Sequence, residues 1–475
     1  MTRLRLLAWP AAALGLAALL ALGIHYWTQV DTVWLEQRLA ATVRAGGPYA
    51  LRIDGGLRLS LLPAPSLQAE RVVLAGLDGE AGAAPFLSAE RVRVDVRLRP
   101  LLAGELHIAA LALDGVRVDL RRRADGRLAV DGLAGTGATS PGTALSSLPY
   151  IERLELRDAH VAWRDEASGR QLRLAALTLS AGPLAPSARG ALSARGRLDE
   201  AGTPLQLDFV LQGNYACELA ARRCALAPLA LRAHGPAAGA DATEFVLDVA
   251  KLTHDAARAE TAVQAAALRF VGTRGARRVE LDGDLAALVL TPAALRGEAL
   301  DARLRLRDEG TRLDLRLMGE ASGEPGAGDY RLSLRSGALA VTHPALRPAP
   351  LAVAFSGELA LTQAREGVAG RLQGRLDGRF DDSTLRLALT ATRLSPPEVE
   401  VDLAIDRLDL DRLLSAAHAA PRSAASRFPV GGDIGGRGTW RIGELRTGAL
   451  RFAAVQGEFR LRAGRFESLP RRSPR

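Results

Sequence analysis

Few residues of this 475-residue chain are arranged as a catalytic or metal-binding site requires. The seven histidines are scattered, no two have the spacing of a metal-ligand pair, and neither an HExxH motif nor a GxSxG nucleophile turn is present. Asp406, Asp409 and Asp411 lie close together, but the glycine and closing glutamate of a calcium loop are missing, so we interpret them as caps at a helix start. We therefore expect no catalytic residue, metal or cofactor, and a protein that is not an enzyme.

The two cysteines are the residues that can most readily react with each other. Cys217 and Cys224 flank Ala220-Ala221, and a two-residue hairpin at these alanines would place the cysteines directly opposite each other, with Cβ atoms about 4.5–5.5 Å apart. In that hairpin the pair would be a hydrogen-bonded one, whose side chains are farther apart. The sequence thus leaves open a disulfide, which an oxidising compartment would permit, and two buried thiols.

Net charge and composition exclude one class of partner. The formal charge of +9 comes almost wholly from arginine, since Lys251 is the single lysine, and aromatic residues make up only 4% of the chain. The arginines are dispersed among apolar and acidic residues, and no aromatic side chains alternate with them to stack on bases. We expect no nucleic-acid binding and interpret the arginines as the solvated faces of strands.

The elements that carry these residues are predicted to be strands. Apolar and polar side chains alternate over residues 91–99, 312–317 and 399–405, which indicates strands with one apolar and one wet face. Acidic-Gly pairs at 125–126, 282–283, 309–310 and 377–378 predict hairpin turns. We expect a mainly β fold, a long curled antiparallel β-sheet built as a repeating, groove-like β-meander of roughly 25 strands.

The N-terminus is predicted to hold the chain in a membrane. Residues 6–30 carry no formal charge apart from whatever fraction His25 holds, and we place a transmembrane anchor at residues 6–28 after a cytoplasmic tip at 1–5 that contains Arg3 and Arg5. A cleaved signal peptide, with Ala21 and Gly23 before the cut, is the alternative. Both interpretations place the body outside the cytoplasm, in the periplasm of a bacterial-type cell if the anchor lies in the inner membrane as a single pass.

The rest of the chain divides by changes in pattern. We expect an amphipathic helix at residues 31–45 and an N-terminal β region at 48–133, followed by a linker at 134–148 that is rich in Gly, Ser and Thr. A repeating β-meander at 149–397 and a C-terminal β region at 398–475 complete the chain. A short helix is expected in the Ala/Leu-rich residues 408–420.

Several blocks in a fixed order resemble the AsmA family of envelope proteins. They are Gly47-Pro48-Tyr49, Leu57-Arg58-Leu59-Ser60, Pro85-Phe86-Leu87, Leu113-Asp114-Gly115, Asp125-Gly126-Arg127-Leu128, the run from Ile405 to Leu413, and Ile442-Gly443-Glu444-Leu445. The resemblance covers essentially the whole chain and is weakest between about residues 185 and 395. In similar proteins a sizeable β region follows the Ile442-Gly443 block, whereas this chain stops at Arg475, as a short member or a truncated product would.

The resemblance implies a protein of the bridge-like lipid-transfer superfamily that supports lipid transport and outer-membrane biogenesis. Its partners would be phospholipid, the inner membrane, and outer-membrane or other envelope proteins. The candidate groove positions are Val92, Val94, Val96, Leu98, Leu304, Leu306, Leu313, Leu315 and Leu317. Two alternatives stay open: these residues can be sealed in a closed sandwich core, and the protein can be an assembly or scaffold factor for outer-membrane proteins that carries no lipid.

Overall fold

The computed structural model describes most of the chain after residue 48. The described residues are 49–60, 64–76, 87–103, 105–122, 150–166, 168–218, 220–237, 239–343, 349–363, 370–394, 397–413, 435–462 and 465–469. They form 25 strands, as many as the length and pattern of the sequence predicted. The chain divides into two compact units, Met1–Gly202 (unit 1) and Thr203–Arg475 (unit 2).

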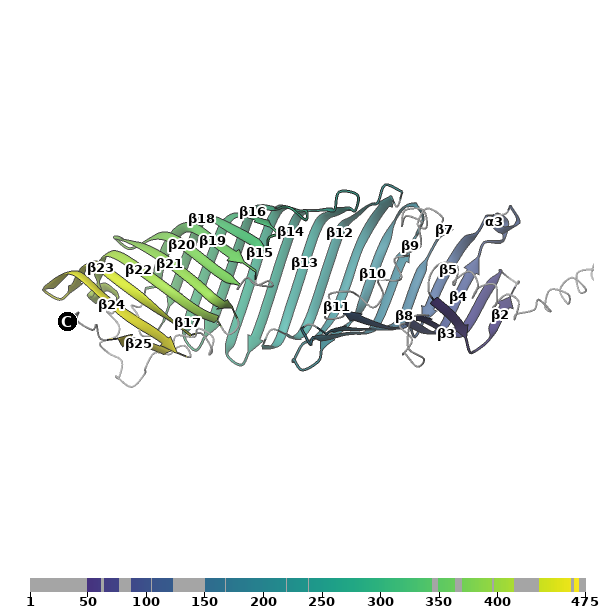
Figure 1. Cartoon of the computed structure of the whole chain (residues 1–475), viewed down its shortest axis with the longest axis horizontal. Helices are drawn as coiled ribbons and strands as arrows, with labels where there is room; N and C mark the ends of the chain where they lie inside the picture. The colour runs from purple at the N-terminus through teal and green to yellow at the C-terminus, as the bar shows by residue number, and fades with distance from the viewer. Residues whose placement is uncertain are drawn as a thin grey trace, which may run out of the picture. The chain divides into compact units, whose positions relative to one another are not determined.

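The described residues of unit 1 form ten strands and one short helix (Figure 1). Its elements are β1 (Tyr49–Ile53), β2 (Leu57–Ser60), β3 (Ser66–Gly76), β4 (Leu87–Val96), α3 (Leu98–Leu102), β5 (His107–Asp114), β6 (Arg117–Arg122), β7 (Tyr150–Ile151), β8 (Leu154–Asp165), β9 (Gln171–Gly182) and β10 (Ser187–Glu200). β1 and β2 both pair with β3, and antiparallel pairing continues through β4 to β5. β7 and β8 both pair in parallel with β5, and β8 also pairs in parallel with β6. β9 then pairs antiparallel with β8 on one side and with β10 on the other.

Unit 1 has a small hydrophobic core in two clusters. Ile53, Leu57 and Ala69 form one, and Ala89, Val116 and Ala159 form the other. Half-buried valines and leucines of β3, β4, β8 and β9 pack against these six residues. The buried positions are mostly small, so this core is a thin layer along the sheet rather than a thick interior.

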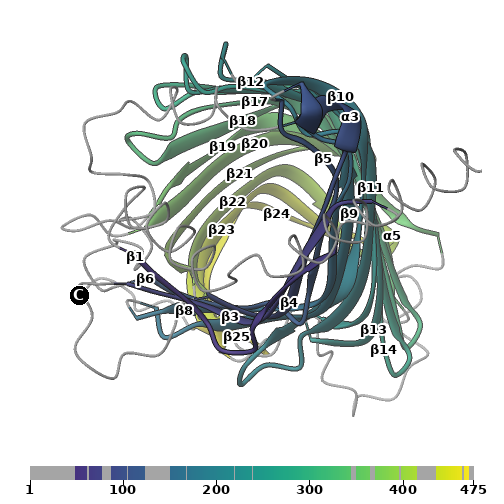
Figure 2. The same cartoon turned by 90° about the vertical axis from the view of Figure 1, so that its right-hand side faces the viewer.

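Unit 2 is a longer meander. Its strands are β11 (Gln206–Glu218), β12 (Arg223–Ala237), β13 (Ala240–Asp255), β14 (Glu260–Arg274), β15 (Arg277–Leu290), β16 (Leu295–Asp308), β17 (Thr311–Glu324), β18 (Asp329–Thr342), β19 (Leu351–Thr362), β20 (Arg371–Phe380), β21 (Ser383–Leu394), β22 (Pro397–Asp409), β23 (Gly435–Thr447), β24 (Leu450–Arg462) and β25 (Arg465–Leu469), with the short helix α5 (Leu410–Leu413) after β22. From β11 to β22 each strand pairs antiparallel with the next. Seen end-on in Figure 2, β17 to β24 form a curved sheet.

Two expectations about pairing need correction. The sheet is mixed rather than purely antiparallel, because β22 pairs with β23 in parallel, as β5 and β6 do with β8. Parallel neighbours need a connection of a dozen residues or more, and residues 123–149 and 410–434 are long enough. Two predicted turns are also wrong: Asp282-Gly283 lies inside β15 and Asp377-Gly378 inside β20, whereas Glu309-Gly310 does lie between two strands.

Five adjacent strands of unit 2 share an irregularity. Along a regular strand, one residue separates successive positions on the same face. In each of β12 to β16, two residues separate one such pair of positions, as between Val249 and Leu252 of β13. An alanine is among the two in every strand, and Ala265 and Ala299 have a φ of 48° and 52°. An extra residue that the partner strand lacks is a β-bulge, which bends and twists the strand locally. We call these five positions the bulge line. Because β12 to β16 all carry the extra residue, the register shifts lie at the margins of this stretch, between Gly213 and Tyr215 of β11 and between Gly297 and Leu300 of β16.

The predicted N-terminal helices, at 6–28 and 31–45, and the predicted linker at 134–148 lie outside the described residues. Within the residues that are described, no helix has the length and apolarity needed to cross a membrane. α5 coincides with the start of the helix expected at 408–420, whose remaining residues from 414 onward are also outside the description.

Candidate functional site

The pairing registers place the apolar residues of unit 2 in continuous rows that cross fourteen strands, from β11 to β24. Row 1 consists of Leu211, Leu231, Leu247, Leu268, Gly283, Ala302, Leu317, Gly337, Phe355, Gly378, Leu385, Ile405, Ile442 and Val455. Row 2 consists of Gly213, Leu229, Val249, Ala266, Leu285, Leu300, Gly319, Leu334, Gly357, Leu376, Leu387, Leu403, Trp440 and Gly457. Row 3 consists of Tyr215, Leu226, Leu252, Val263, Leu288, Gly297, Ala321, Leu332, Leu359, Gly374, Leu389, Val401, Gly438 and Phe459.

These three rows define what we call the apolar face. No charged side chain interrupts any row, and the only side-chain polar groups in them are the Tyr215 hydroxyl and the Trp440 ring N–H. The bulge line runs between rows 2 and 3. With a strict period of two, the two intervening residues would turn the row 3 positions of five strands to the other side of the sheet. The irregular backbone of the bulge line therefore keeps the face continuous despite the extra residues.

The apolar face is not sealed into a closed core by the described residues. Every position of the three rows is half-buried or buried, but no large side chain in the described part of the chain is fully enclosed. Both clusters of buried core residues belong to unit 1. A sandwich would bury its facing leucines completely, so the described part of unit 2 has the burial of a single layer.

The candidate leucines of the sequence lie together on this face. Leu317 is in row 1, and Leu304 is directly opposite Leu315 in a shorter row that runs from Phe209 to Val353 through nine strands. One step farther along the same strands, Leu306 is opposite Leu313. The alternation of residues 312–317 thus predicted the correct face for this part of the sheet.

The candidates of unit 1 are arranged differently. Val92, Val94 and Val96 are half-buried on β4, and Val92 packs against both core clusters. Leu98 is not on a strand, although the sequence predicted one through residue 99: β4 ends at Val96, and Leu98 begins α3 with 51% of its surface exposed. Pro100 explains the change, because proline cannot donate to a strand ladder but is tolerated in the first turn of a helix.

Glycines and aromatic rings occupy neighbouring places on the apolar face. A Cβ added to Gly337 would lie 2.3 Å from the ring of Phe355, and one added to Gly457 would lie 2.5 Å from the ring of Trp440. Gly438 has the same relation to the ring of Phe459, at 2.5 Å. Each large ring therefore fills the space left by a glycine on the adjacent strand. The sequence analysis did not find these pairs because they depend on cross-strand register.

The opposite face is held by ion pairs between neighbouring strands. Arg303 and Arg316 are directly opposite each other on β16 and β17, where like charges repel. Each is compensated diagonally: Arg303 Nε donates to Asp314 at 3.0 Å, and Arg316 donates to Asp301 through Nε at 3.1 Å and Nη2 at 2.6 Å. These hydrogen bonds hold the pKa of Asp314 and of Asp301 below the ordinary aspartate value. One face of the sheet is thus aliphatic and the other ionic.

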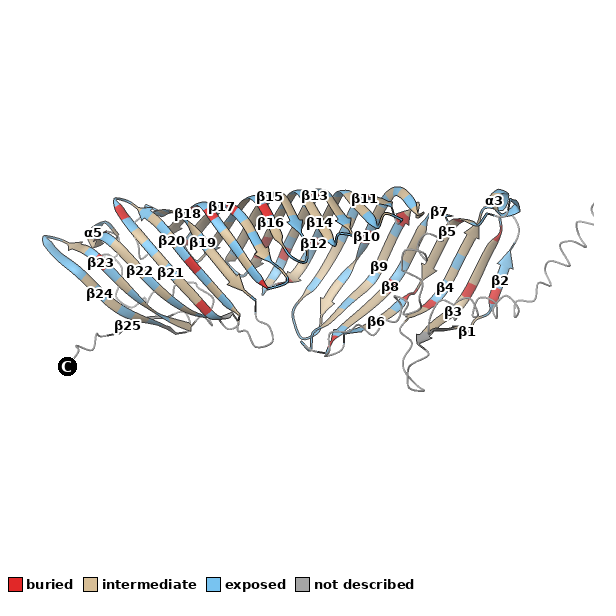
Figure 3. Cartoon of the chain, turned by 45° about the horizontal axis from the view of Figure 1, so that its top comes forward, coloured by how far each residue is buried: buried red, intermediate tan, exposed pale blue. Residues whose placement is uncertain are grey.

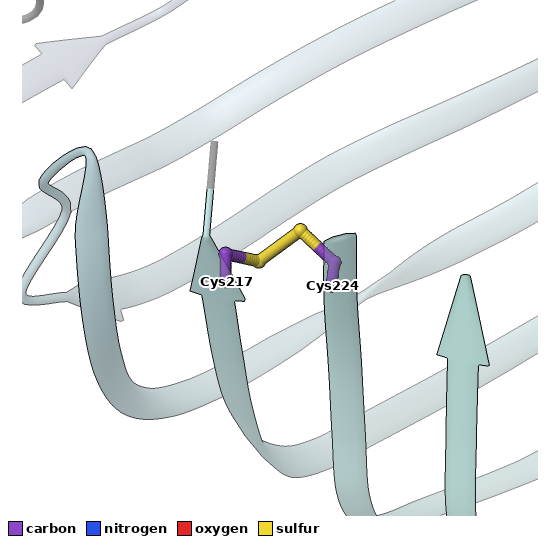
Figure 4. The surroundings of a disulfide bond; sticks show 2 residues. All are labelled: Cys217 and Cys224. Carbon is purple, nitrogen blue, oxygen red and sulfur yellow. A yellow bond between two sulfur atoms is a disulfide. The ribbon is translucent and has the colours of Figure 1, made fainter. Parts of the chain in front are cut away.

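The two cysteines form a disulfide at the margin of the apolar face (Figure 4). Cys217 follows Tyr215 of row 3 by two residues, and Cys217 and Cys224 are direct register partners. Their Cα atoms are 4.1 Å apart, close to the spacing of a non-hydrogen-bonded pair. The expected two-residue hairpin is wrong, since β11 ends at Glu218 and β12 begins at Arg223. The longer connection between these strands places the pair at the closer kind of position.

Comparison with known proteins identifies the first part of the chain. The AsmA family model matches residues 1–219, which include all of unit 1 and the first strand of unit 2. Residues 1–219 are similar to the AsmA family. The match confirms the resemblance for this AsmA region, while most of the apolar face, from β12 onward, follows it in the sequence. No curated protein and no solved structure matches the chain.

Proposed function

We propose that this protein binds phospholipid acyl chains along the apolar face of unit 2 and supports lipid transport and outer-membrane biogenesis from the inner membrane. In this proposal the N-terminal segment is a single-pass anchor and the body is in the periplasm. The observation that carries the proposal is the set of three apolar rows across fourteen strands, left without a second protein layer by the described residues. The match of residues 1–219 to the AsmA family supports an envelope role.

The dimensions of the apolar face suit acyl chains. Fourteen strands at about 4.8 Å each give rows on the order of 60 Å long, several times the roughly 15 Å depth of one leaflet of the hydrocarbon core. Three rows, spaced by two residues, span about 14 Å along the strands. Acyl chains can therefore lie on the face entirely in contact with aliphatic side chains.

The energetic role follows from the cost of exposing hydrocarbon to water. Each methylene that leaves an apolar environment for water costs about 0.8 kcal/mol, so a diacyl lipid does not cross an aqueous space quickly unaided. A continuous aliphatic surface removes most of that cost without any catalytic group. A surface of leucine, valine and alanine also recognises no particular carbon of an acyl chain, so the bound lipid is free to slide along it.

We infer that the apolar face is the inner side of the curved sheet. The solvent exposure of alanines can be compared directly between the two faces, because every alanine has a side chain of the same length. All three alanines of the rows, Ala266, Ala302 and Ala321, are half-buried. On the ionic face Ala338, Ala354 and Ala388 are exposed, while Ala230, Ala340 and Ala404 are half-buried. Side chains on the inner side of a bent sheet converge and cover one another, while those on the outer side spread apart. The alanine pattern supports an apolar inner side and a charged outer side.

Photo-crosslinking from neighbouring residues tests the proposal. A benzophenone side chain is placed at Leu387, in row 2, or at Ala388, the next residue along β21, which is exposed on the ionic face. The full-length protein is irradiated in cells and the adducts are identified by mass spectrometry. Phospholipid adducts at 387 and not at 388 are expected. Equal labelling at both positions, or none at either, would contradict the proposal.

A role as an assembly or scaffold factor is the second candidate, favoured by one observation at the C-terminal end of unit 2. β25 pairs with β24 only along residues 458–462, so among the described strands the opposite end of β24 has one partner, β23. Leu450 and Phe452 are exposed there. Such an edge can accept a strand from another protein. Native mass spectrometry of the full-length protein separates the two functions, because only the lipid-binding function predicts co-purifying phospholipid.

A further inference from the structure

Four of the six large hydrophobic side chains that are exposed in the described residues of unit 1 lie in one turn, the connection between β4 and β5, at residues 98–103 and 105–106. Leu98, Leu101, Leu102 and Leu106 are exposed by 51%, 43%, 79% and 50%. No comparable group of exposed leucines occurs elsewhere in the described residues of unit 1. In Figure 3 α3 lies at the end of β4 and β5 in the colour of exposed residues, and in Figure 1 it projects beyond these strands.

The turn is held firmly at its base. The backbone N–H of Arg97 donates to the carbonyl of His107 at 2.9 Å, which closes the end of the β4–β5 ladder. The Arg97 guanidinium makes two hydrogen bonds to the carboxylate of Glu152, with Nε at 3.0 Å and Nη2 at 2.6 Å. Within the turn, the N–H groups of Ala103 and Glu105 both donate to the carbonyl of Pro100. The exposed leucines are therefore presented by a fixed structure.

The charges around these leucines fit the surface of a lipid bilayer. Arg99 is exposed in the last turn of α3, and the one acidic residue of the segment, Glu105, lies 3.5 Å from His107. Leucines beside an arginine match the depth profile of a membrane interface, where acyl chains lie under anionic phosphates.

The position of unit 1 along the chain gives a second argument. The uncharged run predicted to be the anchor ends at Val30, and β1 begins at Tyr49. The residues between them span at most about 65 Å when fully extended. Unit 1 would therefore stay close to the bilayer that holds the anchor, where even a weak surface contact is favoured by its high local concentration.

We infer that residues 98–106 dock on the phospholipid bilayer, with the leucines among the acyl chains and Arg99 at the phosphates. The inference rests on the membrane anchor that forms part of the proposed function. Docking fixes the end of β4 and β5 at the bilayer and gives unit 1 a defined orientation there. It also offers a lipid leaving the bilayer an apolar surface at the point of exit.

The test uses the full-length protein in nanodiscs of phosphatidylethanolamine and phosphatidylglycerol. A Leu102→Cys variant is labelled with an environment-sensitive fluorophore, which leaves the bonded Cys217 and Cys224 unlabelled, and its quenching by spin-labelled lipid is measured. Ala338→Cys, an exposed position on the ionic face of unit 2, is the matched control. We expect quenching at 102 to be severalfold stronger than at 338. Equal quenching would overturn the inference.

Three further measurements make the result specific. Leu106→Ser in the Leu102→Cys background should reduce quenching severalfold, since a serine adds little to insertion in the interface, and unchanged quenching would count against docking. A benzophenone at 102 should form lipid adducts, and adducts to protein alone would assign the turn to a protein partner instead.

Crosslinking from Leu387 reports on the proposed function separately. Lipid adducts at 387 without quenching at 102 refute docking only. Quenching at 102 without lipid adducts at 387 refutes lipid binding by unit 2 only.

Discussion

The apolar face should lose lipid when a single side chain is made polar, while the fold remains. Leu317 is the most informative position, because its row neighbours are the small residues Ala302 and Gly337, so its side chain is a large part of the local surface. Met318, the next residue along β17, points to the ionic face and is 38% exposed. Leu317→Asn and Met318→Asn are therefore a matched pair of variants.

The expected magnitude follows from what an acyl chain would meet. Replacing Leu317 removes about 2 kcal/mol of apolar contact with a lipid that covers it. The new amide would lie beneath hydrocarbon without a partner, which costs about 1–3 kcal/mol more. Together these costs reduce occupancy of this site by at least about 100-fold. Without lipid the amide is hydrated, since Leu317 is only half-buried, so stability should change by no more than about 1 kcal/mol.

The assay combines a local and a global measurement. A benzophenone at Leu339, on the neighbouring strand β18, reports lipid next to the substituted position, and thermal unfolding reports the fold. We expect the adduct from Leu339 to disappear in Leu317→Asn and to persist in Met318→Asn, with similar unfolding temperatures. Total bound lipid measured by native mass spectrometry should fall less, because the rest of the rows remains. Undiminished adducts in Leu317→Asn, with the fold intact, would refute the reasoning.

Three other expectations concern stability. Gly337→Leu should destabilise the protein by about 1–3 kcal/mol, because its Cβ would collide with the adjacent aromatic ring, and denaturant titration measures this. Removing the disulfide with Cys217→Ser and Cys224→Ser should cost about 2.5 kcal/mol by the loop-entropy relation, measured in the same way. The pKa values of Asp301 and Asp314 are lowered by their arginine partners, so both carboxylates stabilise the fold above the ordinary aspartate pKa, and this contribution is lost as pH falls through the lowered values.

Each of these has a control. Ala338→Leu, on the ionic face next to Gly337, should be nearly neutral, and an equal loss in both variants would contradict the role of the ring. Reducing agent should destabilise the parent protein and leave the double serine variant unchanged. Asn at both Asp301 and Asp314 should flatten the acid side of the stability profile, and an unchanged profile would show that the ion pairs do not contribute.

Local pattern in the sequence was enough to predict strands and, in places, their faces. Alternation over residues 312–317 assigned Leu313, Leu315 and Leu317 to the correct side, because the period of a strand is fixed by its pleat. Alternation failed where a bulge intervenes. Val249 and Leu252 are three residues apart, so a strict period of two places them on opposite faces, although register places both on one. Bulges depend on neighbouring strands, which single-sequence pattern does not reveal.

The glycines were misread for a related reason. Asp282-Gly283 and Asp377-Gly378 have the composition of hairpin turns, but both glycines lie in row 1 within strands. Gly378 is needed for space, since a Cβ there would lie 3.1 Å from the Cβ of Phe355. A glycine selected for space beside a ring and one selected for a turn look identical in the sequence. Likewise, α3 could be anticipated only by giving Pro100 more weight than the alternation around it.

The bulge line has a consequence for how such a chain can change over generations. Removing Ala286 alone would leave one residue between Leu285 and Leu288, so β15 would have a regular period of two beside two neighbours that carry the extra residue. The sheet already joins these two kinds of strand at both margins of the bulge line. Losing the extra residue from β12 or β16 would therefore only move an existing register shift by one strand, whereas losing it from β13, β14 or β15 would add two new shifts. The line can shorten from its ends one strand at a time, while its middle strands are held to a common length.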